Sequence, residues 1–255
     1  MRCPFNAAWD AVDRATTATC QDHPTGGRLP QVNLRETGPG RTVVAVASQN
    51  STLYVADVRK AFGRRQVLDR VDFTLERGEL AGIVGENGAG KTTLLRILAG
   101  ELKPDHGWVI PRGRLGYCPQ RTVLNDSLTV AQHLRYFQRA YQLDDLHRAH
   151  ELVERLNFTQ YRASRVRSLS GGTRQKLNLV IALMHEPAVV LLDEPYQGFD
   201  WETYLHFWEL AGELRDAGRS LLVISHLSHD IDRLDTGYRL ANGVVTPMPV
   251  EAHAG

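Results

Sequence analysis

The chain has 255 residues, and its content of 42% hydrophobic and 23% charged residues is ordinary for a folded globular protein. Its 30 basic and 29 acidic side chains nearly cancel, which argues against a surface built to hold nucleic acid or anionic lipid. Three scattered cysteines argue against a disulfide framework or a cysteine zinc site. The longest aliphatic runs have five residues, whereas a membrane-spanning helix needs about 20.

The first fifty residues differ from the rest of the chain. They hold four of the eleven prolines, a threonine-rich stretch and a Gly-Gly pair, and they show no sustained helical or strand period. We expect residues 1–50 to form a poorly ordered N-terminal extension. Asp10 and Asp13 interrupt the place where a secretory signal would need an apolar core. An alternative is that translation starts at Val44 or Val46, from a GUG codon.

From residue 51 onward, predicted strands alternate with predicted helices in a single domain that reaches about residue 250. Short apolar or alternating runs predict strands at residues 53–58, 71–75, 80–84, 114–118, 188–192 and 220–224. The 3.6-residue period predicts helices at residues 91–99, 127–157 and 201–216. Thr129 and Gln132 form a candidate capping box, and Asn242-Gly243 signals a hairpin. Continuous apolar strands between helices predict an α/β fold whose parallel sheet is covered on both faces.

Residues 85–92 match the phosphate-binding pattern GxxxxGK[ST], between a predicted strand and a predicted helix. Glycines let several backbone N–H groups converge on a polyphosphate, and the helix N-terminus adds partial positive charge. Lys91 would reach the β- and γ-phosphates, and the Thr92 hydroxyl would coordinate Mg²⁺. An ordinary glycine-rich turn is the alternative interpretation. The candidate nucleotide-binding residues here are Gly85, Glu86, Asn87, Gly88, Ala89, Gly90, Lys91, Thr92 and Thr93.

Two carboxylates follow the apolar run at residues 188–192. The C-terminal end of a buried parallel strand lies at the ligand edge of the sheet. We therefore expect Asp193 to hold Mg²⁺ through water, and Glu194 to act as the general base that polarises the attacking water. The alternative is a strand that simply ends in charged loop residues.

Residues 169–175 read LSGGTRQ, which resembles the signature motif of the ABC ATPases, the nucleotide-binding subunits of ATP-binding-cassette systems. Other motifs stand in the family's order. Gln120 resembles its Q-loop glutamine, residues 198–200 its D-loop, His226 its switch histidine and Phe62 its adenine-stacking aromatic. The resemblance covers about residues 53–246, and it is the ordered set that makes it specific.

The resemblance implies a fold, a reaction and a set of site residues. The implied fold is a P-loop NTPase with a parallel core sheet, an N-terminal antiparallel β subdomain and a small helical subdomain at about residues 121–172. The implied reaction is Mg²⁺-dependent ATP hydrolysis, with ATP and Mg²⁺ bound. Gln120 and His226 would join Glu194 in catalysis, and Gln120 would also join Thr92 and Asp193 at the metal. A second anion site at the γ-phosphate held by the opposite subunit would comprise Ser170, Gly171 and Gly172.

The implied partners are a second nucleotide-binding subunit, in a homodimer or heterodimer, and a transmembrane permease subunit. The protein would then be cytoplasmic and held through the permease on the inner face of the membrane, with no nucleic acid partner. Residues 127–130, followed by an amphipathic helix, resemble subunits of bacterial exporters, so export is expected. The alternatives are a non-transport ABC ATPase and a catalytically silent binding module. Gln120 follows Gly107 by only 13 positions, so the connection between those two strands should be short.

Overall fold

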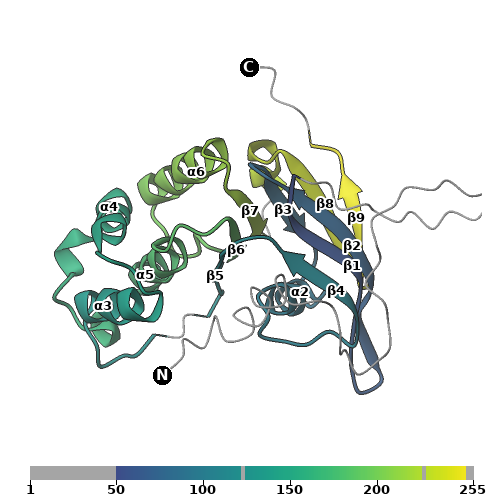
Figure 1. The fold of residues 1–255 in the computed structure, drawn as a ribbon, viewed down its shortest axis with the longest axis horizontal. Helices are drawn as coiled ribbons and strands as arrows, with labels where there is room; N and C mark the ends of the chain where they lie inside the picture. Colours follow the sequence, from purple (N-terminus) through teal and green to yellow (C-terminus); the bar gives the residue numbers. More distant parts are fainter. Residues whose placement is uncertain (1–49, 122–123, 226–227, 251–255) are drawn as a thin grey trace, which may run out of the picture.

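A computed structural model describes residues 50–121, 124–225 and 228–250. The predicted N-terminal extension lies outside these residues, apart from its last one. The described chain builds two sheets and a helical region, and the antiparallel sheet stands at the opposite end of Figure 1 from helices α3 and α4. None of the described helices combines the length and the apolarity that a membrane span requires.

The first sheet is antiparallel and has three strands, in the order β2-β1-β4. Its strands are β1 (Ser51–Phe62), β2 (Arg65–Glu76) and β4 (His106–Pro111). Sequence patterning found only the middle of β1 and the second half of β2. The remaining parts of both strands carry no apolar alternation, and pairing between the two strands defines them instead. Strand β4 was not predicted, because it exists through its pairing with β1.

The second sheet has six strands in the order β5-β6-β7-β3-β8-β9. All its neighbours are parallel except the β8–β9 hairpin, which turns at the predicted Asn242-Gly243. Its strands are β3 (Leu80–Val84), β5 (Leu115–Cys118), β6 (Val189–Asp193), β7 (Ser220–Ile224), β8 (Thr236–Ala241) and β9 (Val244–Met248). Every residue of β6 and β7 is buried, which confirms the expectation of a parallel sheet covered on both faces. The connection from β4 to β5 is short, as expected.

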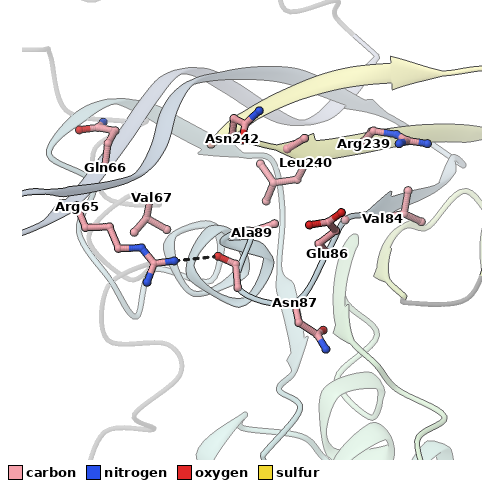
Figure 2. Close-up of a pocket in the computed structure, with 14 residues that line it drawn as sticks. Arg65, Gln66, Val67, Val84, Glu86, Asn87, Ala89, Arg239, Leu240 and Asn242 are labelled. Carbon is pink, nitrogen blue, oxygen red and sulfur yellow. Dashed lines mark hydrogen bonds between the residues drawn. The ribbon is translucent and has the colours of Figure 1, made fainter.

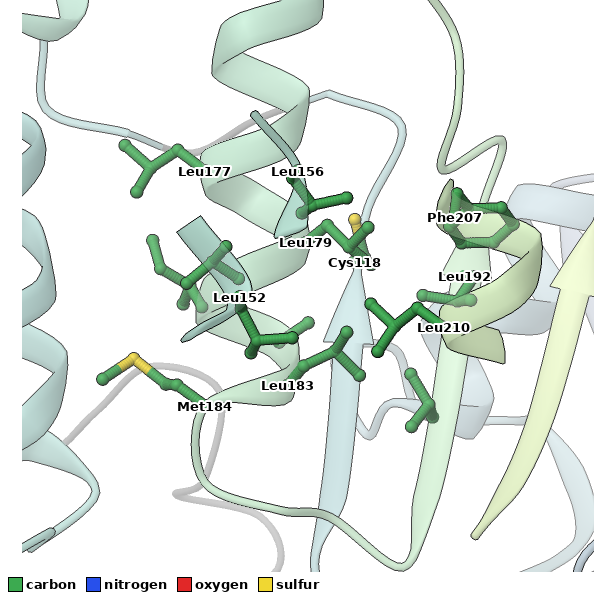
Figure 3. Close-up of a cluster of buried hydrophobic side chains, with 14 of the residues drawn as sticks. Cys118, Leu152, Leu156, Leu177, Leu179, Leu183, Met184, Leu192, Phe207 and Leu210 are labelled. Atoms are coloured by element: carbon green, nitrogen blue, oxygen red, sulfur yellow. The ribbon is translucent and has the colours of Figure 1, made fainter. Parts of the chain in front are cut away.

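The two faces of this sheet pack into two apolar clusters. On one face, α2 (Lys91–Leu98) packs with β1 and β2. On the other face lie α5 (Gly171–Leu183) and α6 (Trp201–Asp216). Figure 3 shows this second cluster, where Leu179 and Leu183 of α5 lie beside Cys118, Leu192 and Leu210. Successive residues of β6 point to opposite faces, so Val190 and Leu192 pack in one cluster and Val189 and Leu191 pack in the other.

The predicted helical stretch 127–157 is two helices rather than one. They are α3 (Val130–Ala140) and α4 (His147–Arg155). Helix α3 ends because Gln142 adopts a left-handed conformation (φ 56°) and its N–H bonds back to Arg139. The capping box at the start of α3 is confirmed, with Thr129 and Gln132 each bonding the other's backbone N–H.

Short 3₁₀ helices connect the remaining elements. Two of them, η1 (Thr159–Tyr161) and η2 (Val166–Ser168), lie between α4 and α5. The third, η3 (Ser228–Arg233), lies between β7 and β8. Helix η3 brings a buried carboxylate, Asp230, close to the end of β7.

Candidate functional site

The loop between β3 and α2 is the glycine-rich turn that the sequence predicts. Gly90, the residue before α2, has φ 106°. A Cβ added at Gly90 would lie 3.0 Å from Cγ1 and 3.1 Å from the carbonyl oxygen of Val67. Glycine is therefore needed there both for the backbone conformation and for the close approach of β2.

Lys91 places its ammonium group inside this loop. Its side chain is buried, and Nζ donates to the carbonyl oxygens of Gly85 at 2.6 Å and Glu86 at 3.0 Å. Burial lowers the pKa of Lys91, while the nearby carboxylates of Glu194 and Asp193 act in the opposite direction. A cation held at a helix N-terminus in this way is suited to meet an anionic ligand.

A pocket of about 430 Å³ opens beside Lys91 and brings together much of the predicted site. Phe62 stands at its edge with half of its surface exposed, and the Lys60 ammonium lies 5.6 Å from its ring centroid. Arg65 and Val67 of β2 also line the pocket, although sequence reasoning did not single them out. The predicted residues that line it are Phe62, Asn87, Gly88, Gly90, Lys91, Thr92, Thr93, Gln120 and Glu194.

The rest of the loop faces a second and larger pocket of about 1030 Å³, shown in Figure 2. Gly85, Glu86 and Ala89 line this pocket, together with residues of the β8–β9 hairpin. Arg65 reaches along the loop and donates to the carbonyl oxygen of Gly88 at 3.4 Å. The predicted loop residues therefore line two neighbouring pockets, and Asn87 and Gly88 line both.

The two predicted carboxylates lie where β6 ends. Asp193 is buried with 1% of its surface exposed, and Glu194 borders the smaller pocket. Glu194 has φ 50°, and its N–H donates to the carbonyl oxygen of Ile224 at 3.0 Å. The Gln120 amide Nε2 donates to Glu194 Oε2 at 2.9 Å. The ends of neighbouring strands β5 and β6 thus bring these two side chains together, although 74 positions separate them in the sequence.

The second predicted anion site lies apart from the pocket. Ser170 is the exposed N-cap of α5, and its Oγ accepts from the Thr173 N–H at 3.2 Å. Gly171 is exposed, and none of these N-terminal residues of α5 lines either pocket. Gly172 packs against the loop after β6, and a Cβ added there would lie 2.1 Å from the Gly198 carbonyl oxygen. Within one chain, the structure does not bring Ser170, Gly171 and Gly172 to Lys91.

Thr92, Gln120 and Asp193 are the predicted ligands of a magnesium ion. The described residues include no group of three His, Cys, Asp or Glu side chains that would form a complete metal site. Mg²⁺ usually keeps several waters and takes one or two carboxylates plus substrate phosphates. One buried carboxylate with a hydroxyl and an amide therefore fits an ion that arrives with a nucleotide. His226, the predicted switch histidine, lies outside the described residues.

A contact between polar residues near Glu194 was missed by sequence reasoning. Tyr196 follows Glu194 by two positions, and its hydroxyl bonds to Ser225 at 2.7 Å and to the buried carboxylate of Asp230. The sequence offers no signal for this contact, because it depends on how the end of β7 and η3 fold back over the loop after β6.

Comparisons with known proteins agree with this geometry. The family described as "ABC transporter" matches residues 68–197. A Nod factor export ATP-binding protein of Cupriavidus metallidurans is 33% identical over 213 residues, covering 75% of this chain and 70% of the relative. A zinc import ATP-binding protein of Photobacterium profundum is 39% identical over 175 residues, covering 68% and 67%. A solved ATP-binding subunit of an ABC transporter has a TM-score of 0.74 at 28% identity, covering 78% of this chain and 90% of that one.

Proposed function

Because this chain belongs to the ABC transporter family as an ATP-binding subunit, we propose that it hydrolyses ATP with magnesium and powers export through a separate membrane subunit. We propose further that residues 51–250 form the ATP-binding domain, with a helical subdomain at about 121–172. Residues 1–50 would be an extension outside it. The observation that carries the proposed chemistry is the contact between Gln120 and Glu194 at the edge of the Lys91 pocket.

ATP would lie along the pocket, with its base on Phe62 and its phosphates over the loop of residues 85–93. Half of the Phe62 surface is exposed and available for stacking. Lys91 would exchange its bonds to two loop carbonyls for bonds to the β- and γ-phosphates. The buried position of Lys91 favours this exchange, because an ammonium group in a poorly solvated site gains more from an anion than it would in water.

Glu194 would take the proton of the water that attacks the γ-phosphate. Gln120 holds one carboxylate oxygen at 2.9 Å and so restricts the directions in which this base can point. His226 would donate to the γ-phosphate. A magnesium ion bound with the nucleotide would neutralise phosphate charge, and its ligands would be Thr92, Gln120 and Asp193.

The exposed start of α5 would serve a second subunit. Ser170, Gly171 and Gly172 lie outside their own chain's pocket, and they offer a hydroxyl and backbone N–H groups at a helix N-terminus. We propose that they meet the γ-phosphate held by Lys91 of another subunit, in a homodimer or a heterodimer. Two nucleotides would then lie between two chains.

The membrane subunit would dock on α3. A groove of about 540 Å³ runs along this helix and is lined by Leu128, Gln132, Arg135, Tyr136, Arg139 and Ala140. Arg135 and Arg139 stand one turn apart, and neither side chain pairs with an acidic residue within the described part of the chain. Such a surface suits an amphipathic segment that carries carboxylates. Docking there would hold the protein on the inner face of the membrane.

Export rather than import is the direction that we propose. The Nod factor export relative aligns over a longer stretch, 213 residues, than the zinc import relative, at 175 residues. A non-transport role is the less favoured alternative, because both of these relatives are transport subunits by name. Transport of a labelled cargo into inverted vesicles that contain the assembled transporter would support export, and ATP-dependent loss of cargo from those vesicles would contradict it.

Replacing Glu194 by Gln tests the chemistry. General-base positioning is typically worth about 10²–10⁴ in rate, so Glu194→Gln should lower ATP turnover by that factor while ATP still binds. Phosphate release with and without magnesium measures turnover, and a fluorescent ATP analogue measures binding. Glu154→Gln, an exposed change on α4, is the matched control and should turn over like the wild type. Turnover of Glu194→Gln at the wild-type rate would remove Glu194 from the role of base.

A further inference from the structure

A buried carboxylate outside the pocket accepts hydrogen bonds from hydroxyl groups of three separate chain segments. Asp230, on η3, has 2% of its surface exposed. It accepts hydrogen bonds from the hydroxyls of Tyr196 and Tyr204, and from Ser225 Oγ at 3.1 Å. Tyr204 lies on α6, Ser225 follows β7, and Tyr196 lies in the loop after β6. We call these four residues the Asp230 cluster.

The cluster is closely connected to the backbone of Glu194. Tyr196 lies two positions after Glu194, and Ser225 directly follows Ile224, whose carbonyl oxygen accepts the Glu194 N–H at 3.0 Å. The Tyr196 hydroxyl oxygen lies 2.7 Å from Ser225 Oγ, so the cluster joins the two chain segments that flank this backbone bond. The loop is also closed on itself, because the Gln197 N–H donates to the Glu194 carbonyl oxygen at 3.2 Å.

Glu194 needs such support because its backbone is unfavourable. Its φ of 50° lies in the left-handed region, which a non-glycine residue keeps only where the surroundings impose it. The Tyr196 ring supplies packing, with its centroid 5.3 Å from that of Tyr204 in an edge-to-face contact. The hydroxyl fixes where that ring sits. Burial, followed by the bond to Asp230, raises the pKa of Tyr196, so its hydroxyl stays protonated and remains a donor.

We propose that Asp230 and Tyr196 are positioning residues for ATP hydrolysis, because they hold the Glu194 backbone and so aim its carboxylate. The proposal rests on the proposed role of Glu194 as base. Neither Asp230 nor Tyr196 lines the nucleotide pocket, so these two residues act on turnover and leave nucleotide binding unchanged. Tyr204 also bonds Asp230, but it lies on α6 and its backbone takes no part in the loop after Glu194.

A double-mutant cycle tests this inference. Tyr196→Phe removes one hydroxyl and keeps the ring, and displacement of a catalytic group by a fraction of an ångström to one ångström costs about 10- to 10²-fold in rate. We expect kcat to fall by that factor with the KM for ATP within about twofold. In the Glu194→Gln background the same change should have no further effect, because residues that act as one unit are not additive.

Tyr204→Phe is the matched control, since it removes another hydroxyl from the same carboxylate. It should lower the melting temperature about as much as Tyr196→Phe and leave kcat near the wild-type value. Equal kcat for the two Phe variants, or an equal fall of kcat on Tyr196→Phe in both backgrounds, would overturn the inference and leave the cluster a structural network. If Tyr196→Phe does not fold, Asp230→Asn takes its place in the same cycle. Wild-type turnover by Glu194→Gln alone would instead show that the base was wrongly assigned.

Discussion

Gly172 has a second reason to be glycine besides the N–H group that it offers. Residue types alone predict that Ser170, Gly171 and Gly172 form a helix N-terminus that attracts anions, and α5 does begin there. The contact between Gly172 and the Gly198 carbonyl oxygen could not be predicted, because it depends on how the loop after β6 lies over α5. One glycine of the pair is fixed by packing, and the other has open space around it.

The two glycines should therefore respond differently to alanine. A Cβ at Gly172 would lie 2.1 Å from a backbone oxygen, so Gly172→Ala must move the loop, and overpacking of this kind costs about 1–3 kcal/mol. Gly171→Ala meets nothing within 4 Å, and alanine in a helix is favoured over glycine by up to about 1 kcal/mol. Urea unfolding of both variants measures the difference. Equal stability of the two would contradict the close approach to Gly198.

At the scale of elements, the sequence predicts best those strands whose residues are buried on both faces of the sheet. Strands β6 and β7 are apolar throughout because both of their faces are covered, so their runs stand out. Strand β4 has mixed exposure and depends on pairing with β1, which periodicity does not reveal. The sequence predicts one helix at 127–157, where the structure has α3 and α4. The break between them was not predicted, because both helices keep the same apolar period and the turn between them carries no glycine or proline.

Helix α3 leads to a prediction about partner binding. Reversing both charges of its groove, with Arg135→Glu and Arg139→Glu, should abolish co-purification with the membrane subunit, because like charges would then face its carboxylates. ATP turnover by the isolated subunit should stay within about twofold of wild type, since α3 lines no part of the nucleotide pocket. Lys103→Glu, an exposed reversal between α2 and β4, should leave both properties unchanged. Normal co-purification of the double variant would exclude this groove as the docking surface.

At the scale of the whole molecule, the site is assembled by the parallel sheet. Lys91, Gln120 and Glu194 are far apart in the sequence, yet they lie around one pocket because neighbouring parallel strands end at the same edge. Motif order and spacing were enough to predict this gathering. The spacing of residues along the chain does not reveal that Ser170 lies away from that pocket. This separation is the feature that favours a site shared between two subunits.

Mixing two inactive variants tests the shared site most directly. Lys91→Ala damages the phosphate loop, and Ser170→Arg places bulk and charge at the start of α5, so each homodimer should be inactive. In a mixed dimer one site carries both changes and the other carries none. If each site hydrolyses ATP independently, random pairing of equal amounts should restore about a quarter of the wild-type rate. No recovery, with mixed dimers shown by cross-linking under ATP, would contradict the account that Lys91 of one chain and Ser170 of another hold the same nucleotide in sites that act independently.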